Sequence, residues 1–139
     1  MTSDALIQFF EEGIAFNKHL GMRVDDITDA RCRIVIPYQD HLVGDPFRPA
    51  LHGGVLSALA DTAGGLAVFL RVGTIHARVS TVDLRMDYYL PAGKADLYAE
   101  ASVVRMGNRV GVARIALHQG GPTVAEGKGV YNIARARAG

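Results

Sequence analysis

The sequence predicts an α+β domain in which a twisted antiparallel sheet wraps around one long helix. The sixteen-residue run Val55 to Leu70 is helical in character and almost entirely apolar, and a helix is predicted over Gly53–Arg71. From Val79 onward, apolar residues instead recur at every second position, in four successive runs with short connections. Such alternation is typical of half-buried strands. Neither the helix nor the strands can bury their apolar surface alone, and a sheet that curls around the helix buries both.

Three elements and one loop are expected before the long helix. Ser3 or Asp4 can cap a short helix in which apolar residues recur at helical spacing. Residues 22–28 alternate weakly, and residues 30–37 alternate clearly and are rich in β-branched side chains, so two strands are predicted. Residues 38–50 contain glycine and prolines and are expected to form an irregular loop that leads into the long helix.

Four strands are expected after the long helix. They are predicted at residues 79–90, 96–106, 109–119 and 123–134, separated by the turn-like segments PAGK, GN and GGP. Successive strands with short connections imply an antiparallel meander. Strict alternation in the first run places Ser80, Val82, Leu84 and Met86 on one face, and Thr81, Asp83, Arg85 and Asp87 on the other.

The length and the charge of the chain exclude several classes of protein function. A chain of 139 residues is expected to form a single domain, 1–139, whose core needs no covalent staples. The formal net charge is +1 and no run of five basic residues occurs, so nucleic acid is not an expected partner. The five histidines are scattered, and no cysteine joins them at ligand spacing, so no metal site is expected.

The sequence also indicates the cellular compartment in which the protein is expected. The single cysteine, Cys32, cannot form an internal disulfide and is expected to be a small core residue. The first sixteen residues carry acids where a signal peptide would carry bases. The longest apolar run is shorter than a bilayer span and contains Asp61. A cytoplasmic protein that does not enter a membrane is therefore predicted.

Asp61 is the only charged residue in the long apolar run, and it lies nine positions after the first residue of the triplet His52-Gly53-Gly54. A carboxylate in so apolar a helix is costly to bury unless it has partners or a function. Two glycines at the start of the helix leave backbone N–H groups open to a ligand. Helix-start donors stabilise a developing oxyanion, and a carboxylate serves as base or nucleophile, so this pattern favours attack on an activated carbonyl.

Four segments carry a resemblance to a known family. LHGGVLSALADTAGGLA, STVDLRMDYYLPAG, EASVVRMGNR and TVAEGKGVY resemble the hotdog-fold acyl-CoA thioesterases of the phenylacetyl-CoA thioesterase type. The resemblance extends over about residues 20–133, and the HGG triplet followed by an acid on an apolar helix is its specific part. It implies a hotdog fold, an acyl-CoA substrate, and subunits that pair into dimers and often tetramers. No metal or organic cofactor is required for this chemistry.

The resemblance also implies a role for each matching residue. Asp61 stands where the family has its catalytic acid, and Gly53 stands where a backbone N–H polarises the thioester carbonyl, with His52 supporting that turn. Thr81 matches a position that helps to place the attacking water. The residues expected to bind substrate or coenzyme A are Gly54, Tyr88, Pro91, Arg105, Gly107, Asn108 and Arg109.

Two other functions stay open at this point. A catalytically silent acyl-CoA-binding protein could keep the fold, although a mere binder gains nothing from Asp61. A hotdog hydratase or dehydratase would also use a helix acid, but would pair it with a catalytic histidine in a different motif.

Helix geometry predicts a shared site. Nine residues at 100° each place Asp61 about 180° around the helix from His52 and about 13 Å further along it. One chain cannot easily direct both at the same carbonyl, so an obligate dimer with two composite sites is predicted. Each site would use His52 and Gly53 from one chain and Asp61 from its partner. Gly64 and Gly65 are expected to allow close packing against this helix.

Overall fold

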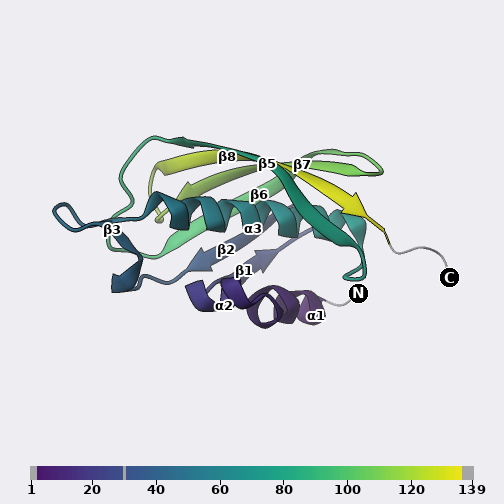
Figure 1. Ribbon diagram of the computed structural model, residues 1–139, viewed down its shortest axis with the longest axis horizontal. Coiled ribbons are helices and arrows are strands. Elements are labelled where there is room, and N and C mark those ends of the chain that lie inside the picture. Colours follow the sequence, from purple (N-terminus) through teal and green to yellow (C-terminus); the bar gives the residue numbers. More distant parts are fainter. Residues whose placement is uncertain (1–2, 30, 136–139) are drawn as a thin grey trace.

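A computed structural model describes residues 3–29 and 31–135. Its main feature is a six-stranded antiparallel sheet that curls around the helix α3 (Gly53–Val72) (Figure 1). The strand order is β1-β2-β6-β7-β8-β5. These strands are β1 (Arg23–Ile27), β2 (Arg31–Ile36), β5 (Arg78–Tyr88), β6 (Leu97–Met106), β7 (Val110–His118) and β8 (Thr123–Ala134). The predicted α+β hotdog architecture, with a wrapped sheet around a long helix, is confirmed.

The predicted four-strand meander is wrong for one strand. Strands β6, β7 and β8 do follow one another in the sheet, but β5 pairs with β8 at the edge and β2 takes the place beside β6. Alternation in the sequence reports which face of a strand is buried and says nothing about which strand lies next to it. As a result β5 is an edge strand with a single neighbour.

Strict alternation also fails within β5. The pairing with β8 shifts register between Thr81 and Asp83, which makes Val82 the extra residue of a β-bulge. Thr81 therefore turns toward α3, where its hydroxyl bonds Asp61. Strict alternation predicts Thr81 and Leu84 on opposite faces of the sheet. The bulge brings both side chains to the same face, which is why the prediction is wrong for Thr81.

Helix α3 is the centre of the core. It begins after the cap His52 and ends at Gly73, which adopts the left-handed conformation (φ 83°) that favours glycine. Its 20 residues extend the predicted helix, Gly53–Arg71, by one residue, and by length and composition alone it could cross a bilayer. Of its most apolar 18-residue stretch, 56% is buried inside the protein, as is typical of the core helix of a folded domain.

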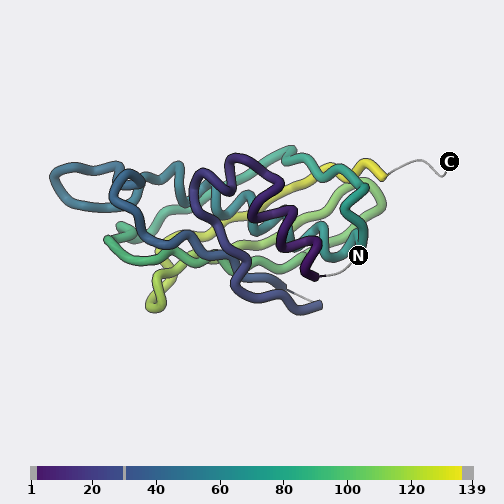
Figure 2. Tube along the Cα trace, turned by 90° about the horizontal axis from the view of Figure 1, so that it is seen from below, coloured from purple at the N-terminus to yellow at the C-terminus, as the bar shows by residue number. Residues whose placement is uncertain are grey.

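The N-terminal segment covers a side of α3 that the sheet leaves open. It consists of α1 (Ser3–Gln8), the π-helix η1 (Phe9–Gly13) and α2 (Ala15–Leu20), and it crosses in front of the chain in Figure 2. The rings of Phe9 and Phe10 meet Phe69 of α3 edge to face at centroid distances of 6.0 and 5.6 Å. Ser3 and Asp4, predicted to precede the first helix as its cap, lie inside its first turn.

Residues 38–50 are more regular than predicted. They contain the 3₁₀ turn η2 (Asp40–Leu42) and a small hairpin of β3 (Val43–Asp45) and β4 (Ala50–Leu51) that projects beyond the sheet in Figure 1. The Asp45 carboxylate accepts the backbone N–H groups of Phe47 and Arg48 at 2.9 and 3.1 Å and so closes the turn. The N–H groups of Arg48 and Phe47 hold the pKa of Asp45 below its ordinary value.

Candidate active site

The start of α3 is organised by His52. Its Nδ1 accepts a hydrogen bond of 2.8 Å from the backbone N–H of Gly54, so the imidazole acts as the helix cap. In the neutral ring the proton then lies on Nε2. The N–H of Gly54, predicted to bind substrate, is thus already committed within the chain. The role of His52 in the active site stays a prediction.

The N–H of Gly53 has no acceptor among the described residues, and it lies at the positive end of a 20-residue helix. Its own carbonyl accepts from the Tyr88 hydroxyl at 3.2 Å, and that hydroxyl also makes a short hydrogen bond with Ser57 one turn further along. Tyr88, from the end of β5, therefore fixes the first turns of the helix. A free donor in a fixed helix start is the arrangement that an oxyanion requires.

Asp61 lies half-buried in the middle of α3. One of its carboxylate oxygens, Oδ1, accepts a hydrogen bond of 2.7 Å from the Thr81 hydroxyl on β5. The Tyr131 hydroxyl also lies near this carboxylate. The Thr81 hydrogen bond orients the carboxylate, and a carboxylate so placed can act as base or nucleophile.

The backbone around Asp61 is fixed by Tyr131 of β8. The Tyr131 hydroxyl donates to the Asp61 carbonyl at 2.9 Å, and the ring is 1% exposed. Burial, and then the nearby Asp61 carboxylate, raises the pKa of Tyr131, so the hydroxyl stays a donor. An added Cβ on Gly64 or Gly129 would collide with this hydroxyl. The close packing predicted for Gly64 is confirmed.

A cavity of about 170 Å³ opens beside Asp61. Apolar side chains from the N-terminal segment and from α3 form much of its wall, and its lining residues are Phe10, Ile14, Asn17, Asp61, Thr62, Gly65, Phe69, Val79, Thr81 and Tyr131. Asn17 is 3% exposed and ties the two walls together. Its amide donates to the Phe10 carbonyl at 3.0 Å and accepts from the Thr62 hydroxyl at 3.3 Å. The cavity is suited to an apolar group attached to a carbonyl at Asp61.

Gly53, whose backbone N–H is the unpaired donor, lines a different cavity. This cavity, about 370 Å³, lies at the mouth of α3 and is lined by Asp45, Arg48, Ala50, Leu51, Gly53, Leu56, Tyr88, Tyr89, Leu90, Pro91 and Ala92. It shares no lining residue with the cavity at Asp61. Eight helical residues also separate Gly53 from Asp61 by about 12 Å along the axis. Within one chain the N–H of Gly53 and the carboxylate of Asp61 therefore line different cavities.

The remaining predicted binding residues lie at the other end of the sheet. Asn108 and Arg109 line a cavity of about 380 Å³ with Asn132 and the end of β8. Arg105 lies near the end of β6, and Gly107 closes the β6–β7 turn by donating its N–H to the Val110 carbonyl. Within one chain these residues are remote from Tyr88 and Pro91, because Val110 pairs beside Asn132 whereas Tyr88 pairs beside Ala125.

Neither a metal cluster nor a reactive thiol is found in the described part of the chain. No group of three histidine, cysteine or acidic side chains is placed to hold a metal ion there. Cys32 is 2% exposed, and burial raises the pKa of its thiol to about 12. Its interpretation as a core residue is confirmed.

Sequence reasoning missed three residues at this site: Asn17, Ser57 and Tyr131. Each acts through a partner 31 to 70 positions away in the chain, so local periodicity carries no trace of it. Asn17 had one usable signal, since it is a polar residue on the otherwise apolar side of a short helix and polar side chains are seldom buried without a partner.

Comparisons with known proteins agree on one family. The thioesterase superfamily matches residues 49–126. The chain is 39% identical over 140 residues to a protein of Halobacterium salinarum described only provisionally as an esterase, covering 94% of this chain and 92% of that one. It is 32% identical over 123 residues to the medium/long-chain acyl-CoA thioesterase YigI of Escherichia coli, covering 80% and 79%.

Solved structures show the same architecture. A protein of Shewanella oneidensis related to the thioesterase superfamily superposes with a TM-score of 0.82 at 28% identity, covering 93% of each chain. A thioesterase of Haemophilus influenzae superposes with a TM-score of 0.83, covering 97% of this chain and 92% of that one. At 23% identity the latter likeness concerns the fold alone.

Proposed function

This chain belongs to the thioesterase superfamily, and we propose that it hydrolyses acyl-CoA thioesters with Asp61 as the general base or nucleophile. It is a thioester hydrolase by its family and by its similarity to an acyl-CoA thioesterase. The observation that carries the proposed role of Asp61 is its geometry. Thr81 holds Oδ1 at 2.7 Å, and the carboxylate lines the 170 Å³ cavity beside α3.

The Gly53 N–H is the proposed oxyanion donor. It is the open donor at the start of α3, where the helix dipole favours developing negative charge. His52 supports it indirectly, because its cap holds the first turn while leaving this N–H free. Water placed near Thr81 and activated by Asp61 would attack the carbonyl carbon, the oxyanion would form against Gly53, and the coenzyme A thiolate would leave.

In our proposal, each active site takes the Gly53 N–H from one subunit and the Asp61 carboxylate with Thr81 from the other. Strand β5 is an edge strand with eleven residues, so a second copy can pair with it antiparallel. Such pairing about the middle of β5 brings the Tyr88 end of one strand to the Arg78 end of the other. Gly53 lies at the first end and the Asp61–Thr81 pair lies toward the second. A two-fold dimer therefore assembles two composite sites.

The same pairing gathers the proposed coenzyme A contacts. Tyr88 and Pro91 line the cavity at Gly53 in one protomer. Arg105 and Arg109 lie at the opposite end of the sheet. In the proposed dimer, that end of the partner's sheet lies next to the cavity at Gly53. Guanidinium groups suit the phosphates of coenzyme A. The 170 Å³ cavity at Asp61 would take the acyl group. We also propose that the protein is cytoplasmic, as its sequence predicts.

The test is the hydrolysis of a panel of acyl-CoA substrates by the variant Asp61→Asn. The amide has nearly the shape of the carboxylate but is neither a base nor a useful nucleophile, so kcat should fall by about 10² or more while the fold survives. Asp29→Asn, which changes an exposed carboxylate between β1 and β2 at the opposite edge of the sheet, is the matched control and should retain wild-type kcat. A normal kcat for Asp61→Asn with the best substrate would exclude the proposed role.

A further inference from the structure

The cavity beside Asp61 runs along one side of α3. Asp61, Gly65 and Phe69 all line it, and residues four positions apart in a helix lie on the same side of it. At a rise of about 1.5 Å per residue, Gly65 lies about 6 Å from Asp61 along the axis and Phe69 about 12 Å from it. An acyl group whose carbonyl lies at Asp61 would therefore pass over Gly65 and point toward Phe69.

Aromatic rings close the far end of this cavity. Phe10 and Phe69 both line it and meet edge to face at a centroid distance of 5.6 Å. Phe9 packs against both of these rings, at 5.6 and 6.0 Å. Because the rings are buried against one another, they form a packed wall that a longer acyl chain would have to displace.

The wall opposite α3 is fixed as well. The N-terminal segment supplies this wall, and its buried Asn17 accepts a hydrogen bond from Thr62 of α3 at 3.3 Å. Glu11 of the same segment accepts the backbone N–H of Val24 on β1 at 2.8 Å. The segment is thus tied both to the helix and to the sheet, so the cavity is held at its size from two sides.

Gly65 leaves room in the middle of the cavity. The nearest atom to a Cβ added there would belong to the Tyr131 ring, at 3.7 Å, so the methyl group would enter the cavity without a clash. A Cβ added to the neighbouring Gly64 would instead collide with the Tyr131 hydroxyl. Any side chain at position 65 would therefore take space from a ligand and not from the protein core.

We propose that Gly65 sets the size of the acyl group that this protein accepts, namely a compact apolar group of about six carbon atoms, the size of a benzene ring. The cavity has a volume of about 170 Å³, and an apolar cavity of about 150 Å³ holds one benzene molecule. A linear chain and a ring of this size share the same chemistry at the cavity wall. The inference rests on the proposed hydrolysis of acyl-CoA at Asp61.

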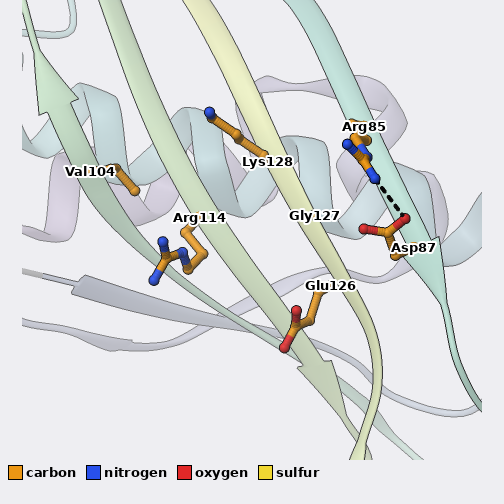
Figure 3. Close-up of a pocket in the computed structure, with 7 residues that line it drawn as sticks. All are labelled: Arg85, Asp87, Val104, Arg114, Glu126, Gly127 and Lys128. Carbon is orange, nitrogen blue, oxygen red and sulfur yellow. Dashed lines mark ion pairs between the residues drawn. The ribbon is translucent and has the colours of Figure 1, made fainter.

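The larger hollow on the outer face of the sheet does not suit such an acyl group. Its volume is about 320 Å³, but charged side chains from β5, β7 and β8 surround it, as Figure 3 shows, and these are Arg85, Asp87, Arg114, Glu126 and Lys128. An apolar chain laid among them would remove water from charged groups without replacing its hydrogen bonds. The cavity at Asp61 is the one whose walls match an apolar group.

Steady-state hydrolysis of butyryl-, hexanoyl-, octanoyl- and phenylacetyl-CoA tests the inference. The wild type should show its highest kcat/KM with hexanoyl- or phenylacetyl-CoA, and these two substrates distinguish a chain from a ring. Octanoyl-CoA should be at least about tenfold poorer, because one surplus methylene in a filled apolar pocket costs about 10- to 200-fold. Gly65→Ala should lower the ratio of kcat/KM for hexanoyl-CoA to that for butyryl-CoA by about tenfold or more.

Two further variants separate size selection from a general effect of substitution. Gly121→Ala adds the same methyl group on an exposed turn, where nothing lies within 4 Å of it, and should leave all these ratios unchanged. Phe69→Leu shortens the wall at the far end and should raise the ratio of octanoyl-CoA to hexanoyl-CoA about fivefold. Thermal unfolding of each variant shows that the compared proteins are folded.

Alkyl thioethers of coenzyme A, which cannot be hydrolysed, separate this inference from the proposed function. Their affinities for the wild type and for Gly65→Ala are measured by calorimetry. If no acyl-CoA is hydrolysed but the hexyl thioether binds best and loses that advantage in Gly65→Ala, the proposed function fails and the size selection stands. Equal hydrolysis of octanoyl- and hexanoyl-CoA by the wild type, or an unchanged ratio of hexanoyl- to butyryl-CoA in Gly65→Ala, would overturn the inference and leave the Asp61 assignment intact.

Discussion

The Thr81 hydroxyl donates a hydrogen bond of 2.7 Å to the carboxylate of Asp61, from an edge strand to the middle of the core helix. This contact exists because a β-bulge at Val82 turns Thr81 toward α3. It fixes one oxygen of the carboxylate that we propose as the base or nucleophile. The edge strand that carries Thr81 is also the one through which we propose that two subunits pair, so the same strand orients the acid and recruits the partner.

Removing this hydroxyl should impair turnover. Thr81→Val keeps the shape of the side chain but leaves Asp61 without its donor, and hydrogen bonds to charged groups contribute about 1.5–3 kcal/mol. We expect kcat to fall about 10- to 100-fold with little change in KM, measured by release of the coenzyme A thiol. Thr81→Ser retains the donor and should stay within about threefold of wild type. If both variants lose the same activity, the hydroxyl has no special role.

The packing of Tyr131 against α3 makes a prediction about two neighbouring glycines. An added Cβ on Gly64 would collide with the Tyr131 hydroxyl, whereas one on Gly65 would meet the ring at 3.7 Å, an ordinary contact. Gly64→Ala should therefore lower the free energy of unfolding by about 1–3 kcal/mol, as overpacking does. Gly65→Ala should be neutral or stabilising by up to about 1 kcal/mol, because alanine favours helix. Denaturant titration of both variants decides the point, and equal effects would contradict the packing argument.

The sequence was informative where a residue's role depends on local pattern. The apolar run around Asp61 and the alternation of β6 to β8 predicted the core helix, the sheet and the curvature of one around the other. The bulge at Val82 could not be predicted, because it is defined by the pairing of β5 with β8, about fifty positions later in the chain. Asn17 was missed for the same reason, since its partner Thr62 lies 45 positions away.

The two arginines that flank the β6–β7 turn should act on coenzyme A and not on the acyl group. Replacing Arg105 and Arg109 by alanine removes two cations that suit phosphate. We expect KM to rise about tenfold for acyl-CoA but little for an acyl-pantetheine analogue that lacks the nucleotide, with kcat preserved for both. Steady-state kinetics on the two substrates makes the comparison. Equal changes in KM would remove this turn from the binding site.

The composite site makes the sharpest prediction, because two inactive proteins should regain activity when mixed. Asp61→Asn lacks the base, and Gly53→Pro lacks the backbone donor at the first helical position, where proline is tolerated. Gly53→Ala keeps the N–H, its Cβ would lie 3.6 Å from the Tyr88 ring, and it should remain active as the control.

A heterodimer of the two inactive variants would contain one wild-type site and one site that lacks both groups. Random reassortment makes half of the dimers mixed, and each has one working site of two, so activity should recover to about a quarter of wild type by this symmetry. Subunit exchange is verified independently by native mass spectrometry of tagged chains. Full exchange without recovery would mean that Gly53 and Asp61 serve the same carbonyl from within one chain, which the 12 Å helical separation and their unshared cavities argue against.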